Sequence, residues 1–214
     1  MSITPHEIGT LFGYFGATLG VSMVIPQILR TLRNRKLTGV SALSWSMSVF
    51  SCTGWMLYGI LAHEAVQIPG NVLLVSGSIA VVLLAPARIS VPLRALLLIL
   101  GLGSYGLLAA ATSADMVVAI AIAIGVAGAL PQIARSIRRP KHQRSAVSLS
   151  TWWMKVFSQA CWLLFAVLVR DWTVLASSLF VQTCNVTVLA VESRRAVVVH
   201  HDADALPQIV AATA

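Results

Sequence analysis

The amino-acid sequence contains the same unit twice, and this internal repeat restricts the possible folds more than any other feature. Residues 20–33 (GVSMVIPQILRTLR) and residues 125–138 (GVAGALPQIARSIR) are identical at seven of 14 positions, and both contain Pro-Gln-Ile. At an offset of 107, residues 40–61 and 147–168 then share 10 of 22 residues. Two tandem copies of one unit are typical of repeat architectures, so we expect two similarly folded halves.

The composition indicates that this unit lies in a lipid bilayer. Hydrophobic residues make up 57% of the 214 residues, and charged residues only 10%. Such a chain has too few polar groups to cover a surface that faces water. The net charge is +8, but the basic residues form short clusters between apolar stretches. This placement favours membrane-orientation signals over a nucleic-acid-binding surface.

Seven apolar stretches are long enough to cross a bilayer as helices, which requires about 20 residues each. No sustained alternation of polar and apolar residues indicates an outer-membrane barrel. The sequence therefore predicts an all-α protein, a seven-helix transmembrane bundle. The predicted spans are residues 8–29, 40–61, 66–86, 93–112, 116–134, 147–169 and 172–191.

The distribution of basic residues predicts the orientation of these helices. Alternate connections and the C-terminal tail hold 13 of the 15 Lys and Arg residues. Positive residues stay on the cytoplasmic side. We therefore expect a multi-pass protein of the plasma (inner) membrane with its N-terminus outside and its C-terminus in the cytoplasm.

Both repeats then run from outside to inside, so they are parallel and an odd helix must link them. We expect a first three-helix repeat in residues 1–86, a linker helix in 87–115, a second repeat in 116–192 and a cytoplasmic tail in 193–214. From about residue 196 the sequence shows no helical period, which indicates a flexible tail. Parallel repeats of this kind occur in transporters that bind the solute between their halves.

The repeated motifs also resemble those of a known family. Each repeat has Pro-Gln near the end of its first helix, then a basic loop, Val-Ser, and an aromatic-rich second helix that in the first repeat ends Trp-Met-Leu-Tyr-Gly at 55–59. This pattern resembles the PQ-loop repeat proteins and, among them, the SWEET sugar transporters and their bacterial relatives, over about residues 8–192. The resemblance implies a 3+1+3 bundle and passive, bidirectional transport without ATP or a cofactor. Ser44 and Thr151 stand where sugar-transporting members usually have proline. This difference weakens the expectation of a sugar as solute, but not the resemblance to the family.

The two Pro-Gln pairs are candidates for gating hinges. Pro26 and Pro131 each remove a hydrogen bond from their helix and produce a kink. Gln27 and Gln132 could satisfy the carbonyl groups that this leaves free. Because transporters move one repeat against the other, we expect moving hinges rather than static kinks.

Polar residues inside the third helix of each repeat are candidates for solute binding. Asn71 needs a hydrogen-bond partner within the bilayer, and the resemblance implies that this position binds substrate. Its repeat counterpart is Ser178, and Asn185 lies on the same helical face seven residues further on. An interhelical hydrogen bond is the alternative role for such residues.

Trp55 and Trp162 occupy equivalent positions near the outer ends of the second and sixth helices, four residues after Ser51 and Ser158. Aromatic rings pack against the apolar faces of sugars and also form belts at membrane interfaces. The symmetric pairing favours a shared solute pocket built from these four residues.

The remaining tryptophans and one lysine lie nearer the predicted cytoplasmic interface. For Trp45, Trp152 and Trp153 a membrane belt is the expected role. Lys155 is the one charged residue well inside a predicted span, about two turns from the interface. We expect its side chain to reach the interface by snorkelling, although an intramembrane charge is also a functional candidate.

Several patterns are missing from the sequence, and this narrows its function. It contains no phosphate-binding loop for ATP and no carboxylate in mid-span to carry protons. Cys52, Cys161 and Cys184 have no metal-ligand spacing, and no nucleophile has a His or Asp within the spans. We therefore expect neither an enzyme nor a metal or cofactor site.

Together these observations predict a facilitative uniporter of a small polar solute, with a sugar as the expected solute. A membrane receptor or adaptor without transport and a proton-coupled amino-acid carrier are the alternatives. A charged pocket would favour the receptor, whereas a neutral pocket with Asn, Ser and Trp favours the carrier. The sequence leaves homo-oligomerisation open.

Overall fold

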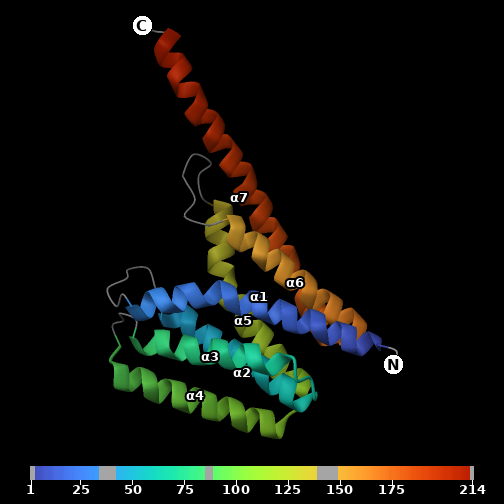
Figure 1. Ribbon diagram of the computed structural model, residues 1–214. Coiled ribbons are helices and arrows are strands. Elements are labelled where there is room, and N and C mark those ends of the chain that lie inside the picture. The colour runs from blue at the N-terminus through green and yellow to red at the C-terminus, as the bar shows by residue number, and fades with distance from the viewer. Residues whose placement is uncertain (1–2, 34–41, 85–88, 139–148, 213–214) are drawn as a thin grey trace.

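A computed structural model describes residues 3–33, 42–84, 89–138 and 149–212, and these segments fold into helices without strands (Figure 1). Five of the helices are long and apolar enough to cross a membrane. The helices are α1 (Pro5–Arg33), α2 (Ala42–Leu61), α3 (Gln67–Leu84), α4 (Val91–Ala111), α5 (Ala114–Arg138), α6 (Leu149–Val169) and α7 (Trp172–Ala212). The predicted all-α, seven-helix architecture is confirmed.

The helices pack as two equivalent groups of three. In the first repeat α3 contacts both α1 and α2, and in the second repeat α7 contacts both α5 and α6. Between the repeats α1 packs along α6, and α2 packs along α5. These two interfaces are equivalent, because each joins the first helix of one repeat to the second helix of the other. The linker α4 packs against α2, α3 and α5, outside both groups.

The turns that join the second and third helices repeat in detail. His63 and Arg170 both have positive φ, 59° and 62°. Arg170 directly follows α6, and His63 follows α2 after one intervening residue. In each turn the next residue donates its backbone N–H to the carbonyl five residues earlier, Glu64 to Gly59 and Asp171 to Ala166. This is the hydrogen bond of a Schellman helix end. The offset of 107 found in the sequence thus holds for the backbone conformation as well.

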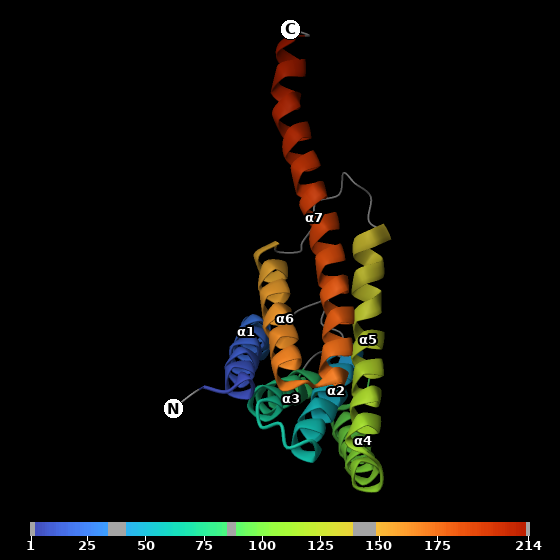
Figure 2. The same cartoon turned by 90° about the vertical axis from the view of Figure 1, so that its right-hand side faces the viewer.

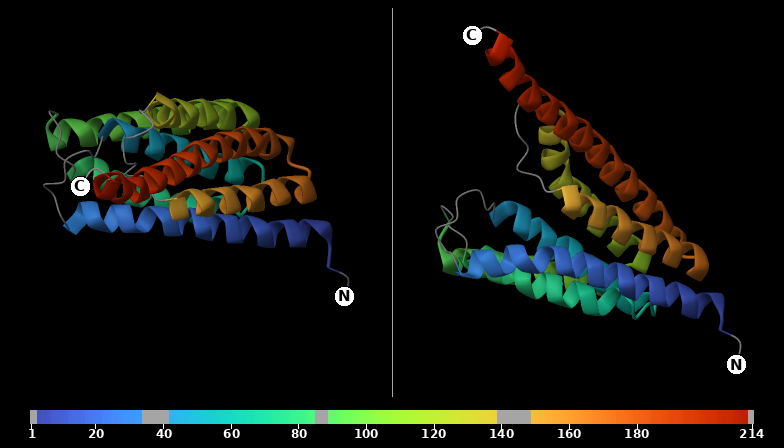
Figure 3. Two further views of the ribbon diagram at one scale, coloured as in Figure 1. Left: turned by 90° about the horizontal axis from the view of Figure 1, so that it is seen from above. Right: turned by 45° about the horizontal axis from the view of Figure 1, so that its top comes forward.

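The two repeats converge at one end of the bundle and diverge at the other (Figures 1 and 3). We call the end that contains the start of α1 and the α2–α3 and α6–α7 turns the closed end, and the opposite end the splayed end. The largest core cluster lies toward the closed end and joins residues of both repeats: Tyr58, Val66, Val118, Phe165, Ala166 and Val174. Burial of apolar side chains therefore holds the repeats together at this end.

Close packing between the repeats depends on small residues. A Cβ atom at Gly13 would lie 3.0 Å from Phe165 Cδ2, and one at Gly16 would lie 3.1 Å from Cys161 Cβ. At the equivalent interface, a Cβ atom at Gly54 would meet Ala121 and the Tyr105 hydroxyl. Glycine at these positions lets helix backbones approach closely, as is common between transmembrane helices.

The C-terminal segment differs from the sequence expectation. The sequence indicates a flexible tail from about residue 196, whereas α7 continues as one helix to Ala212 and extends beyond the other helices (Figure 2). Its 41 residues correspond to about 60 Å at 1.5 Å per residue. The apolar residues between positions 196 and 212 do not recur at helical spacing, which is why helical periodicity is not visible in the sequence.

Candidate solute site between the two repeats

A cavity of about 380 Å³ lies between the two repeats. This volume falls in the range of small-molecule pockets, about 300–1,000 Å³. Residues of both repeats line the cavity. Of the predicted binding residues, the structure brings six to this cavity, namely Ser51, Trp55, Asn71, Trp162, Ser178 and Asn185.

The two predicted tryptophans form matching aromatic pairs. The ring of Trp55 meets Tyr58 edge to face, with centroids 5.9 Å apart, and Trp162 meets Phe165 in the same way at 5.5 Å. Edge-to-face pairs of this kind hold each indole in a defined orientation. The two rings that line the cavity are thus positioned by equivalent neighbours, which fits a shared binding surface.

Ser51 and Ser158 use their hydroxyl groups to join the repeats. The Ser51 hydroxyl donates to the carbonyl of Ala121 at 2.9 Å, and the Ser158 hydroxyl donates to the carbonyl of Gly16 at 2.8 Å. These are equivalent hydrogen bonds across the two repeat interfaces. Ser51 also lines the cavity, whereas Ser158 does not belong to its lining. Sequence symmetry alone predicts both residues equally, because it does not show which one is covered by its neighbours.

Three polar residues of the third helices reach the cavity. The Asn71 side-chain amide donates one hydrogen bond to the carbonyl of Gln67 at 2.6 Å, within the same helix. Its carbonyl oxygen and its second N–H therefore remain available for a solute. Ser178 and Asn185 line the α7 side of the cavity and are buried. The site thus offers hydrogen-bonding groups from both repeats.

One face of α6 contributes residues that sequence reasoning assigned elsewhere or missed. Trp152, Lys155, Gln159 and Trp162 all line the cavity and follow a 3-4-3 spacing, which places them on one side of a helix. Trp152 is buried rather than part of a membrane belt. The spacing is visible in the sequence and could have identified this face once the position of Trp162 was given.

The snorkelling expected of Lys155 also differs from the structure. Its ammonium lies over the Trp152 ring, 4.1 Å from the centroid, and the residue forms part of the cavity wall. By contrast, Trp153 is 51% exposed on the outer surface, as expected for a lipid-facing residue. The cavity is therefore not the neutral pocket that the sequence favoured.

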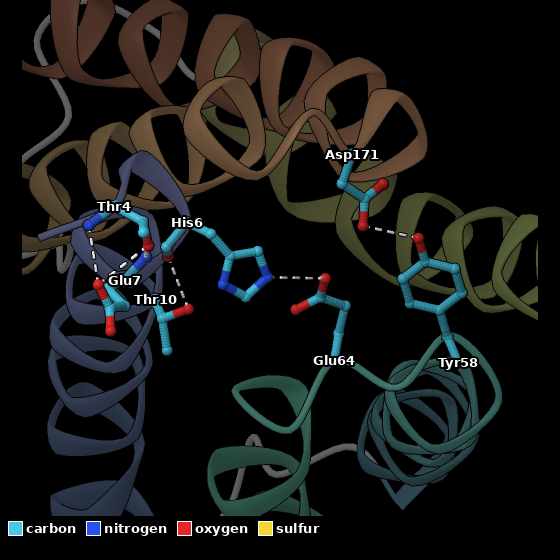
Figure 4. A network of polar contacts seen from close by, with 7 residues as sticks. All are labelled: Thr4, His6, Glu7, Thr10, Tyr58, Glu64 and Asp171. Carbon is cyan, nitrogen blue, oxygen red and sulfur yellow. Dashed lines mark hydrogen bonds and ion pairs between the residues drawn. The ribbon is translucent and has the colours of Figure 1, made fainter.

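Polar contacts seal the closed end of the bundle (Figure 4). The Tyr58 hydroxyl donates to the Asp171 carboxylate at 2.6 Å and so joins the two repeats directly. His6 lies 3.7 Å from Glu64. Burial raises the pKa of the Glu64 carboxyl, the nearby His6 lowers it, and the negative charge of Asp171 raises it further. The net pKa is above the ordinary value, since burial has the largest influence.

The predicted hinge residues lie within continuous helices. Pro26 is inside α1, which runs on to Arg33, and α5 runs through positions 131 and 132 to Arg138. The side chains of Gln27, Pro131 and Gln132 lie outside what the structure describes. The gating role of these four residues stays a prediction.

Comparison with known proteins agrees with this architecture. Residues 8–68 match the family model described as PQ loop repeat. The structure of a eukaryotic SWEET transporter aligns with a TM-score of 0.74 and 17% sequence identity, covering 90% of this chain and 97% of that chain. Comparison with curated proteins finds no match.

At this identity the structural likeness concerns the fold alone. The family match covers α2 and most of α1, and the shared fold extends over both repeats and the linker. Residues 8–68 are thus similar to a PQ-loop repeat, and the chain shares its fold with a SWEET transporter.

Proposed function

We propose that this protein is a passive membrane carrier that moves a small polar solute, a sugar or a close chemical relative, by alternating access. One observation carries the proposal: a cavity lies between two equivalent repeats that touch at one end and diverge at the other. Transporters built from such repeats bind the solute at the repeat interface and expose it to one side at a time.

The lining supports a solute that has both hydroxyl groups and apolar faces. Trp55 and Trp162 present rings to the cavity, and Asn71 supplies an acceptor and a donor. Sugars combine both features, because their C–H faces pack on aromatic rings and their hydroxyls pair with amides. A solute without hydroxyls would leave the buried polar groups unpaired, at a cost of about 1–3 kcal/mol for each group.

The transport cycle follows from the packing. In the conformation described, the contacts of Tyr58 with Asp171 and the apolar core keep the closed end shut. Rocking the repeats about Pro26 and Pro131 would separate these contacts and bring the splayed ends together. Because the two repeat interfaces are equivalent, both halves can move by the same change in geometry.

The positive-inside rule places the splayed end in the cytoplasm, so this conformation is inward-facing. Labelling of single cysteines in a cysteine-free background tests this. A cysteine at Ser113 should react with an impermeant thiol reagent from outside, and one at position 34 should not. The reverse pattern would contradict the proposed orientation.

Flux measurements in proteoliposomes test the proposed function. Purified protein should equilibrate a radiolabelled solute from a panel of neutral sugars, polyols and sugar derivatives without accumulating it. An imposed pH gradient should leave the end-point unchanged. Accumulation driven by protons would instead support the proton-coupled carrier, with Lys155 as the first residue to test.

Substitutions in the cavity connect the flux to the site. Asn71→Ala should weaken binding of the transported solute by roughly 5- to 150-fold, corresponding to about 1–3 kcal/mol. Trp55→Ala and Trp162→Ala should also weaken it, and Trp153→Ala is the matched control because its ring faces outward. Unchanged affinity in a folded Asn71→Ala protein would contradict the assignment of this site.

The receptor alternative is favoured by one observation, the charge of Lys155 in the cavity wall. A receptor would bind a solute in detergent but would not release it across a membrane. Saturable binding without any flux in proteoliposomes would therefore favour the receptor over the carrier.

A further inference from the structure

Lys155 makes one wall of the cavity positively charged. The repeat alignment shows that the first repeat has no charged residue at the equivalent position. At the offset of 107, Lys155 of α6 corresponds to Ser48 of α2, and Gln159 corresponds to Cys52. The tryptophans on either side are kept, since Trp152 and Trp162 correspond to Trp45 and Trp55. The second repeat thus keeps both tryptophans of this helix face and carries a lysine and a glutamine between them.

This cation needs a partner that the described part of the chain does not provide. A charged amine in the interior of a membrane protein is costly unless it is paired. Contact with the Trp152 ring contributes about 0.5–2 kcal/mol, but it leaves the positive charge in place. Among the described residues, Lys155 has no ion pair, and the cavity lining contains no Asp or Glu.

The other groups in the cavity suit a polyhydroxy compound. Lys155 and Trp162 are seven residues apart on one helix face, or about 10 Å at 1.5 Å per residue. Gln159 lies between them, and Asn71 lines the same cavity from α3. One small solute could therefore contact the ammonium at one end and an indole ring at the other, with amide groups between them.

We propose that the preferred solute is a sugar acid, a polyhydroxy monocarboxylate whose carboxylate pairs with Lys155. This inference rests on the proposed carrier function and specifies its substrate class. The carboxylate supplies the missing counter-charge, the hydroxyls pair with Asn71 and Gln159, and the ring face packs on Trp162. A neutral sugar would leave the ammonium unpaired once water is displaced from it.

A solute of this class makes transport sensitive to membrane potential. The cavity carries one positive charge when empty and is neutral when a monoanion is bound. Passive transport of a monoanion ends at electrochemical equilibrium, so the concentration ratio changes about tenfold for each ~59 mV of imposed potential. The end-point for a neutral sugar does not depend on potential.

Two probes that differ at a single carbon test the inference. D-glucuronate and D-glucose have the same ring, and only the first carries a carboxylate. In proteoliposomes of the full chain at zero potential, we expect radiolabelled D-glucuronate to enter at least about tenfold faster than D-glucose. A potassium gradient with valinomycin should then shift the D-glucuronate end-point. Protein-free liposomes give the background leak.

Variants at position 155 test whether Lys155 causes the preference for D-glucuronate. Lys155→Ser introduces the residue of the first repeat and should lower the rate ratio of D-glucuronate to D-glucose by about tenfold or more. Lys155→Arg keeps the charge and should retain the preference for D-glucuronate. Trp153→Ala should leave the ratio unchanged. If Lys155→Ser does not fold, the comparison of the two probes on the unaltered protein still decides the question.

The outcomes separate this inference from the proposed function. Entry of D-glucose in preference to D-glucuronate would overturn the inference and leave the carrier function intact. An unchanged ratio in folded Lys155→Ser would also overturn it, because the charge would then not select the solute. Failure of every solute in the full panel to enter would overturn both proposals.

Discussion

The two repeats share their contacts at the interfaces and differ in the cavity. Ser51 and Ser158 donate equivalent hydrogen bonds, and the Trp55 and Trp162 rings have equivalent edge-to-face partners. Among the residues that line the cavity, Asn71 of the first repeat corresponds to Ser178 of the second. The proposed transport cycle moves both interfaces in the same way, which fits their equivalent contacts. A solute is itself asymmetric, so the lining of its site can differ between the repeats.

The two repeats also differ at the closed end, where one has a hydroxyl group that the other lacks. Tyr58 and Phe165 occupy equivalent positions, and Glu64 and Asp171 occupy equivalent turns. Tyr58 reaches Asp171 of the opposite repeat, whereas the Phe165 ring has no group that could bond to Glu64, which instead lies beside His6. The repeats are thus joined by one hydrogen bond at this level rather than by two.

Exchanging a packing residue between the repeats should have the largest effect. Gly54 of α2 corresponds to Cys161 of α6. In Gly54→Cys the new side chain would overlap Ala121 and Tyr105, so we expect a loss at the upper end of the ~1–3 kcal/mol typical of overpacking. Thermal unfolding in detergent measures this loss.

The matched control for this exchange is Gly103→Ala, because no atom lies within 4 Å of a Cβ atom at Gly103. Its stability should be equal to or slightly above that of the unaltered protein, since alanine favours helix. If both variants unfold at the same temperature, the close approach of α2 to α5 does not depend on Gly54.

Removing the hydroxyl that distinguishes the two closed-end aromatics should have an intermediate effect. Tyr58→Phe deletes the hydrogen bond to Asp171 and makes the first repeat like the second. Loss of a hydrogen bond to a charged group costs about 1.5 kcal/mol or more, so the closed end should open about tenfold more often.

Accessibility of the closed end measures this opening. A single cysteine at Val66, which is 1% exposed, should react faster with a thiol reagent in Tyr58→Phe than in the parent. Tyr14→Phe is the control, because Tyr14 is 42% exposed on α1. Equal labelling rates in all three proteins would show that the hydrogen bond does not hold this end shut.

The smallest effect is expected for the two interface serines. Ser51→Ala and Ser158→Ala each remove one equivalent hydrogen bond, so both should lower the free energy of unfolding by about 1 kcal/mol. Because only Ser51 also lines the cavity, Ser51→Ala alone should change solute affinity. Equal changes in affinity for both variants would contradict the separation of interface and site.

The repeat and the helices could be predicted from the sequence alone, because both depend on local patterns. Spans of about 20 apolar residues predict transmembrane helices without reference to their neighbours. The offset of 107 between matching motifs also relates His63 and Arg170, which both have positive φ. Trp55 and Trp162 could be predicted as lining residues because they occupy equivalent positions in the two repeats, and Asn71 because it is a polar residue within an apolar span.

The side of each helix that faces the other repeat could not be predicted from the sequence and is known from the folded structure. Ser51 lines the cavity and Ser158 does not, although the sequence treats them alike. Lys155 and Trp152 turn toward the cavity rather than the membrane interface. A helix that is apolar on all sides has no stripe to mark its inner face, so helix rotation is set by packing between the repeats. That packing depends on contacts between residues more than 100 positions apart, such as Ser158 with Gly16.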